Sequence, residues 1–163
     1  MELTIRKAKL DDALPLTRLL KEMGWFQSID SVPFETALPR LFHHLELCLG
    51  DSSHSLYVAE QGNNQLAGYV SVHWLPYLFL PGPEGFVSEL FIREPNRGLG
   101  IGTRLLEAVK QEASERDCFR LSLLNGKQRE SYQRGFYKHL GWEERDFMAN
   151  FIYWMPFEEV EAS

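Results

Sequence analysis

Three glycines at alternate positions, Gly98, Gly100 and Gly102, give this chain its clearest candidate for a ligand-binding turn. They follow Arg97 and stand between a strand-like apolar segment and a segment with the apolar period of a helix. Glycine has no side chain to cover its backbone N–H group, and the first turn of a helix adds the positive end of the helix dipole. The pattern therefore predicts a turn that binds a phosphate or pyrophosphate group.

Two common phosphate-binding designs do not fit this turn. A P-loop ends in Gly-Lys followed by Ser or Thr, whereas Gly102 is followed by Thr103 and Arg104. A dinucleotide-binding turn has the pattern G-x-G-x-x-G near the first strand, whereas here the third glycine comes one residue early and the turn lies past the middle of the chain. The turn fits a third design, in which an Arg or Gln precedes glycines at the start of a helix.

Hydrophobic periodicity and turn residues divide the chain into short helices and strands that must position this turn. We expect strands at 3–8, 56–60, 65–75, 86–92 and 119–124, helices at 12–23, 34–49, 102–115 and 129–140, and a last hairpin at 143–154. No repeat is visible, and no linker is long enough to separate two domains. The sequence thus predicts a mixed α/β fold in a single domain over residues 1–163, in the order β-α-α-β-β-β-α-β-α-β-β.

The bulk composition excludes several classes of partner. A formal net charge of −6 and a pI of about 5.4 argue against a chain that binds nucleic acid by counterion release. No apolar run is long enough to span a bilayer, and the first residues lack the apolar core of a signal peptide. Cys48 and Cys118 lack the spacing of metal ligands, which favours free thiols in a reducing compartment. We therefore expect a cytoplasmic protein with no nucleic-acid or membrane partner.

The turn and two other segments resemble the GCN5-related N-acetyltransferase (GNAT) superfamily. Arg97, Gly100 and Gly102 match its Arg/Gln-x-x-Gly-x-Gly/Ala signature, and residues 89–92 are similar to the fourth strand that precedes it. Residues 136–142, with the sequence Phe-Tyr-Lys-His-Leu-Gly-Trp, resemble the end of the family's late helix. The resemblance covers nearly the whole chain and implies a mostly antiparallel sheet flanked by helices.

The resemblance implies that acetyl-CoA is the cosubstrate, that no metal takes part, and that the acetyl group passes directly to a primary amine. The backbone N–H groups of the turn would hold the pyrophosphate, and the fourth strand would pair with the pantetheine arm as with an added strand. Asn125, just beyond the fifth strand, would bond the arm or the substrate. The residues expected to bind the cosubstrate are Leu90, Phe91, Ile92, Arg97, Gly98, Leu99, Gly100, Ile101, Gly102, Thr103 and Asn125.

Glu89 and Tyr137 are the expected catalytic residues. The amine must lose a proton before it attacks, and the departing thiolate must gain one. On a regular strand Glu89 shares a face with Val87 and Phe91, and apolar surroundings would raise its pKa toward that of a useful base, acting directly or through a water. Tyr137 matches the family's general acid, with Tyr132 as the fallback. The structural alternatives are that Glu89 faces solvent or a helix and that Tyr137 is part of the packing.

Other residues leave the acceptor open between a small-molecule amine and a peptide amine. Six aromatic side chains in the segments that would select it could wrap an alkylammonium group or simply form core. They are Trp25, Phe26, Phe34, Trp74, Tyr77 and Phe79. His43 and Glu46 share a helix face, but without a third ligand an exposed helix surface is favoured over a metal site. A homodimer is left open, and the alternative function is a non-catalytic acyl-CoA-binding sensor or interaction module.

Overall fold

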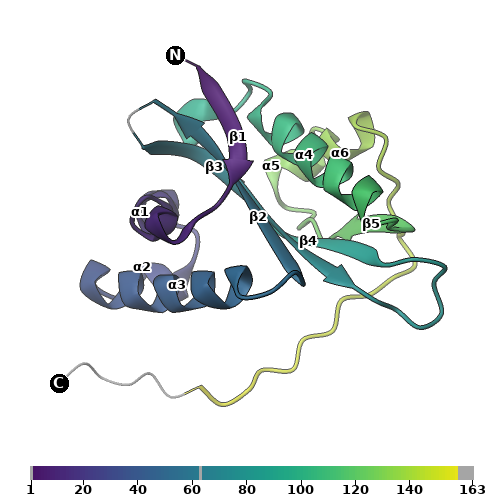
Figure 1. Cartoon of the computed structure of the whole chain (residues 1–163), viewed down its shortest axis with the longest axis horizontal. Helices are drawn as coiled ribbons and strands as arrows, with labels where there is room; N and C mark the ends of the chain where they lie inside the picture. The colour runs from purple at the N-terminus through teal and green to yellow at the C-terminus, as the bar shows by residue number, and fades with distance from the viewer. Residues whose placement is uncertain (1, 63, 158–163) are drawn as a thin grey trace. The chain divides into compact units, whose positions relative to one another are not determined.

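The computed structural model describes residues 2–62 and 64–157, and its five strands form one sheet in the order β1-β2-β3-β4-β5 (Figure 1). Strands β1 to β4 run antiparallel to their neighbours, and β5 pairs parallel with β4. This confirms the expected mixed α/β fold with a mostly antiparallel sheet. The elements in chain order are β1 (Leu3–Lys7), η1 (Leu10–Asp12), α1 (Ala13–Met23), α2 (Gln27–Asp30), α3 (Phe34–Leu49), β2 (His54–Gln61), β3 (Gln65–Leu75), β4 (Glu84–Ile92), η2 (Glu94–Asn96), α4 (Ile101–Glu115), β5 (Arg120–Leu123), α5 (Glu130–Gln133) and α6 (Phe136–His139).

Helices cover both faces of the sheet. Helices α1 and α3 lie on one face and α4 lies on the other (Figure 1). Leu19 of α1, Leu45 of α3 and Tyr69 of β3 belong to one buried apolar cluster. The next residue of β3, Val70, points to the opposite face, because successive side chains of a strand alternate. Each fully buried side chain of this size contributes roughly 1.5–3 kcal/mol, so the two cores hold the helices firmly on the sheet.

The chain forms two compact units, Met1–Leu124 and Asn125–Ser163. The sheet, the helices α1 to α4 and the glycine turn all belong to the first unit. The expectation of one domain over residues 1–163 stays a prediction. No helix in the described part of the chain is long and apolar enough to cross a membrane.

The last third of the chain departs from the sequence-based expectation in two places. The expected helix at 129–140 is divided into α5 and α6, because Gly135 has a φ of 68°, which a right-handed helix does not contain. The expected hairpin at 143–154 is wrong, since residues 143–157 contain no strand. Aromatic and apolar residues there favour a strand, but a strand forms only where a neighbour pairs with its backbone. Large apolar side chains of this segment are exposed: Phe147, Met148, Phe151, Ile152, Tyr153, Trp154, Met155 and Phe157.

A buried carboxylate fixes α4 against the sheet. Glu112 is only 5% exposed and accepts hydrogen bonds from Ser55 (2.8 Å) and Tyr57 (2.6 Å) of β2. Arg116 (3.0 Å) and Lys7 (3.3 Å) donate to the same carboxylate. Burial by itself would raise the pKa of Glu112, but these four donors outweigh it and hold the pKa below its ordinary value. The charged form of Glu112 therefore stabilises the first unit.

We expect Glu112→Gln to lower the free energy of unfolding by about 2 kcal/mol at neutral pH, because the charge-assisted bonds weaken and an amide N–H₂ group faces other donors. Since the folded-state pKa is lowered, this stabilisation is present above pH 4.5 and is lost as the pH falls through the folded-state value. The wild type and the variant should therefore converge in acid when urea unfolding is measured as a function of pH. As a control, Glu107→Gln removes a carboxylate that bonds Lys110 at the surface (2.8 Å) and should change stability by less than about 0.5 kcal/mol. Equal losses in the two variants would contradict this prediction.

Candidate functional site

The glycine turn leads directly into α4. Gly98 and Gly100 both have a φ of +75°, in the left-handed region, and Gly100 is the N-cap residue of α4. A Cβ atom at either position would meet nothing within 4 Å. Glycine is therefore required there by the backbone conformation and not by a lack of space, and the outer side of the turn is open.

The backbone N–H groups of this turn, at residues 98–103, have no hydrogen-bond acceptor among the described residues. The first hydrogen bond of α4 runs from the N–H of Arg104 to the carbonyl oxygen of Gly100, at 3.1 Å. A helix start with this many unpaired donors carries partial positive charge and suits an anion such as pyrophosphate. The residues expected to hold the pyrophosphate are thus those whose amides are unpaired.

Arg97 stands at the entrance of the turn and is held by two contacts. Its Nε donates to the backbone oxygen of Ile92 at 3.1 Å. Its guanidinium carbon lies 4.8 Å from the centre of the Trp25 ring, in a cation–π contact. The sequence predicts the position of Arg97, but the contact with Trp25 joins distant segments and carries no local signal. Both contacts fix a positive charge next to the unpaired amides.

Strand β4 has one open edge beside this turn. Strand β5 pairs only with residues 84–87 of β4, whereas β3 pairs with β4 as far as Ile92. The N–H of Arg93 donates to the carbonyl oxygen of Ala67 on the β3 side, and strand alternation then directs the N–H and C=O of Leu90 away from β3. No strand among the described residues covers that edge. An extended ligand with amide groups could pair there as an added strand does.

A β-bulge at Ser88 changes the face on which Glu89 lies. Glu89 is opposite Ser71, whereas Val87 is opposite the next residue of β3, so Ser88 is the extra residue. Neighbouring residues of β3 point to opposite faces, and Glu89 and Val87 therefore do so too. The prediction that these two side chains share a face is wrong, because it assumed regular alternation. Glu89 does share a face with Phe91, as expected.

The carboxylate of Glu89 is half-buried and accepts a hydrogen bond from the hydroxyl of Tyr69, at 3.1 Å. Burial raises the pKa of Glu89 above its ordinary value, and the bond from Tyr69 opposes this shift. Tyr69 is 3% exposed, and burial followed by the nearby charge of Glu89 raises its pKa as well. The pKa of the expected base is thus shifted in the expected direction. Sequence analysis missed Tyr69, because its contact depends on the register between β3 and β4.

Tyr137 and Tyr132 have different surroundings in the second unit. The Tyr137 ring contacts the rings of Phe136 and Trp142, with centroids 5.0 and 6.0 Å apart. Burial raises the pKa of Tyr137 to about 12, so its hydroxyl stays protonated at neutral pH. The hydroxyl of Tyr132 instead donates to the carboxylate of Glu144, at 2.9 Å. Tyr137 is therefore the better candidate for a proton donor.

Asn125 lies at the start of the second unit, where its Oδ1 accepts a hydrogen bond from the hydroxyl of Ser131, at 3.1 Å. The structure thus brings Glu89, Arg97 and the glycine turn together in the first unit, whereas Asn125 and Tyr137 belong to the second. The catalytic and binding roles of these residues stay predictions.

Aromatic rings gather next to β4 on the face that carries Glu89. Trp25 and Phe26 make edge contacts with Phe91, with centroids 6.1 and 5.1 Å apart, and Tyr69 lies 5.8 Å from the same ring. Trp74 is different, because it is buried and donates to a serine hydroxyl in the core. Two of the six aromatic residues named from the sequence, Trp25 and Phe26, therefore lie at the candidate site.

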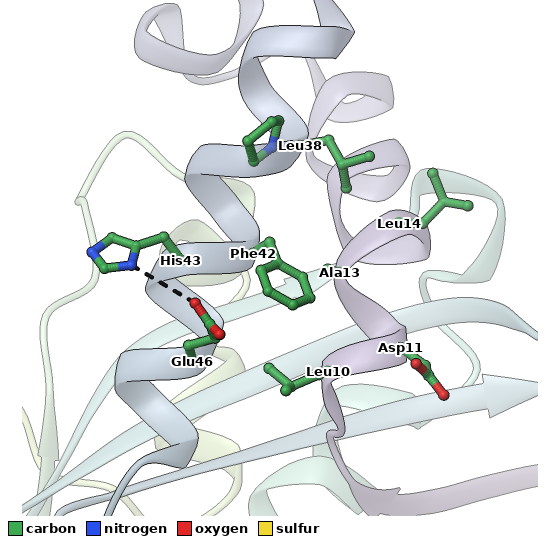
Figure 2. Close-up of a pocket in the computed structure, with 9 residues that line it drawn as sticks. Leu10, Asp11, Ala13, Leu14, Leu38, Phe42, His43 and Glu46 are labelled. Carbon is green, nitrogen blue, oxygen red and sulfur yellow. Dashed lines mark ion pairs between the residues drawn. The ribbon is translucent and has the colours of Figure 1, made fainter.

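A separate groove lies between α3 and the start of α1 (Figure 2). Its lining is mainly apolar and includes Leu14, Leu38 and Phe42. His43 and Glu46 also line it, with Nδ1 and Oε2 3.9 Å apart (Figure 2). Within residues 2–62 and 64–157, no group of three or more His, Cys, Asp or Glu side chains could hold a metal ion. None of the expected cosubstrate-binding or catalytic residues lines this groove.

Comparison with solved structures finds the same fold in several proteins. A transcriptional regulator from Bacillus halodurans C-125 is 25% identical, with a TM-score of 0.79 over 93% of this chain and 100% of that chain. A ribosomal-protein-alanine N-acetyltransferase from Brucella melitensis biovar Abortus 2308 is 22% identical, with a TM-score of 0.69 over 94% of this chain and 100% of that chain. Glucosamine-6-phosphate N-acetyltransferase from Arabidopsis thaliana is 18% identical, with a TM-score of 0.72 over 94% of this chain and 99% of that chain.

Comparison of sequences gives a family but no individual relative. No curated protein matches this chain in sequence. The sequence model of the Acetyltransferase (GNAT) family matches residues 20–142, which include the sheet from β2 to β5, the glycine turn and α4. This match covers well over half of the chain and agrees with the fold. The chain belongs to the GNAT family of acetyltransferases.

Proposed function

We propose that this protein transfers an acetyl group from acetyl-CoA directly to the primary amine of a small molecule or a peptide. The observation that carries the proposal is the run of unpaired backbone N–H groups at residues 98–103, in the glycine turn and at the start of α4. The diphosphate of coenzyme A is an anion that such a turn is suited to bind. Membership of an acetyltransferase family supports the same cosubstrate.

The open edge of β4 supports the placement of the rest of the cosubstrate. From the turn, the chain leads back along β4 from Ile92 through Leu90 to Glu89. In this proposal the N–H and C=O of Leu90 pair with the amides of the pantetheine arm, and Arg97 helps to neutralise the diphosphate. Asn125 bonds the arm or the substrate. The bound cosubstrate supplies an acyl group activated as a thioester.

Side chains of the chain itself serve proton transfer at the attacking nitrogen and at the departing sulfur. Glu89 accepts a proton from the acceptor ammonium, directly or through a water, so that the nitrogen lone pair becomes available for attack. Tyr137 donates its phenolic proton to the departing thiolate sulfur as the C–S bond breaks, and the second proton that the attacking nitrogen loses in forming the amide restores the phenol. Burial supports both roles, because it raises the pKa of the Glu89 carboxyl and keeps the Tyr137 hydroxyl protonated.

The similar structures and the aromatic rings near Glu89 bear on the class of amine. The similar structures include an enzyme named for alanine of a ribosomal protein and an enzyme named for glucosamine 6-phosphate. Near Glu89, the rings of Trp25, Phe26 and Phe91 provide apolar and π surface for an acceptor that carries a positive charge. A panel of amino sugars, polyamines and peptides with free N-termini would identify the acceptor, with release of free coenzyme A thiol as the readout.

We expect Gly100→Ala to weaken acetyl-CoA binding by about tenfold or more, because a side chain at a φ of +75° strains the turn and displaces its amides. Isothermal titration calorimetry with coenzyme A measures the change. Gly24→Ala is the matched control, since Gly24 has a φ of +64°, also has no atom within 4 Å of a Cβ, and lies at the end of α1. Both variants should lose about 1 kcal/mol of stability, and only the first should lose affinity. Equal affinities for the two variants would contradict the proposed binding turn.

We expect Tyr137→Phe to lower kcat by about ten- to a hundredfold while the affinity for coenzyme A stays unchanged, because the phenyl ring keeps the packing and loses only the proton donor. Steady-state kinetics with the best acceptor measure this effect. Tyr132→Phe serves as the control, because it also removes a tyrosine hydroxyl of the second unit, one that bonds Glu144. Full activity of Tyr137→Phe, or an equal loss in both variants, would show that Tyr137 is not the acid.

We expect Glu89→Gln to remove the acidic limb of the pH dependence of kcat/KM. Burial raises the pKa of Glu89 above its ordinary 4.5, so the limb of the wild type should lie above that pH and report the loss of the charged base. At neutral pH the variant should be about a hundredfold slower. If Glu89→Gln keeps full activity and the same pH profile while coenzyme A still binds, the base is another group. Binding of coenzyme A with no turnover by the wild type across the whole panel would instead favour a non-catalytic acyl-CoA-binding module.

A further inference from the structure

We propose that Tyr69 is a positioning residue for this reaction and that its hydroxyl holds the carboxylate of Glu89 in place as the base. The inference rests on the proposed function, in which Glu89 takes the proton of the acceptor. Tyr69 is 3% exposed, and its hydroxyl bonds Glu89 while its ring contacts Phe91, so it acts through Glu89 and not on the ligand.

The register of the sheet makes this contact. Tyr69 lies directly opposite Phe91, and Glu89 lies opposite Ser71. Tyr69 and Glu89 are therefore diagonal neighbours on one face of the sheet, a separation that an aromatic side chain can span. The hydroxyl of Tyr69 donates to Oε1 of Glu89 at 3.1 Å. Without the bulge at Ser88, Glu89 would point to the other face and the bond could not form.

The ring that carries this hydroxyl has little freedom to move. Tyr69 is 3% exposed and belongs to the buried cluster that includes Leu45 of α3 and Val58 of β2. Its ring also makes an edge contact with Phe91, with centroids 5.8 Å apart. A donor on a locked ring holds its acceptor with less loss of entropy than a donor on a flexible side chain. Because the Tyr69 ring is fixed in the core, its hydroxyl restrains the position of the half-buried Glu89 carboxylate.

Among the described residues, two titratable groups interact electrostatically with the Glu89 carboxylate: Tyr69 from β3 and Cys48 from α3. Burial, and after it the charge of Glu89, raises the pKa of the Cys48 thiol, which is therefore neutral at physiological pH. The Tyr69 hydroxyl is also neutral, but its O–H bond points its positive end at the carboxylate. The hydrogen bond therefore favours the charged form of Glu89, which is the form that can accept a proton.

The test compares Tyr69→Phe with Tyr57→Phe. Both changes remove a tyrosine hydroxyl that donates to a carboxylate. Tyr57 is half-buried and bonds Glu112, at 2.6 Å, away from the candidate site. Two readouts are measured for each variant: the pH dependence of kcat/KM, and the titration of the Glu89 side-chain carboxyl by carbon-13 NMR, with its signal assigned from Glu89→Gln. Thermal melting shows that both variants are folded.

We expect Tyr69→Phe to move both the Glu89 titration and the acidic limb of kcat/KM to higher pH, because the bond that favours the carboxylate is lost. On that limb kcat/KM should fall by about three- to tenfold, with KM for acetyl-CoA unchanged. Tyr57→Phe should lower stability and move neither curve. If Tyr69→Phe leaves both curves in place while Glu89→Gln is inactive, the role of Tyr69 is refuted and the assignment of Glu89 as the base stands. If Glu89→Gln is fully active, the base assignment of the proposed function fails, whatever Tyr69→Phe does to the NMR titration.

Discussion

The candidate site depends on the separation of β4 from β5 at the middle of β4. The two strands pair only over residues 84–87 of β4, where they are packed so tightly that a Cβ on Gly85 would lie 2.4 Å from a methyl carbon of Leu121. The bulge at Ser88 follows at once, and a bulge increases the local twist of its strand. The backbone beyond it keeps β3 on one side and has an open edge on the other. A parallel neighbour of only four residues leaves that edge exposed.

The same geometry aligns the open edge with the start of α4. A short connection, η2 and the glycine turn, links the end of β4 to the helix. The helix itself is held in place by a fully buried apolar face that includes Leu105 and Leu106, and by the carboxylate of Glu112 bonded to β2. Because α4 cannot shift on the sheet, its unpaired first amides stay at one end of the open edge. Arg97 completes this junction through Ile92 and Trp25.

The expected base lies where the hydrophobic core meets this open edge. Glu89 has Phe91 as a neighbour on its face and the hydroxyl of Tyr69 as a hydrogen-bond donor. An apolar environment alone would favour the neutral acid, and full exposure would leave an ordinary carboxylate of low pKa. The observed combination of partial burial and one donor lies between these limits. Such a carboxyl can change its protonation state closer to neutral pH than an exposed one.

Local patterns in the sequence were sufficient for the five strands, for α1, α3 and α4, and for the glycine turn, but not for the short helix α2. They also indicated Glu89, Arg97 and Tyr137 as chemically capable residues. Periodicity and turn residues are properties of neighbours along the chain, so a sequence can display them directly. Three features depend on strand register, which is set by contacts between distant segments. They are the bulge at Ser88, the end of the pairing between β4 and β5 at Val87, and the hydrogen bond from Tyr69 to Glu89. The apolar segment after residue 143 shows the converse: its composition favours a strand, but only a paired neighbour could make it one. Tertiary structure decided these features, because the strands of a sheet form hydrogen bonds with segments that are distant in the sequence.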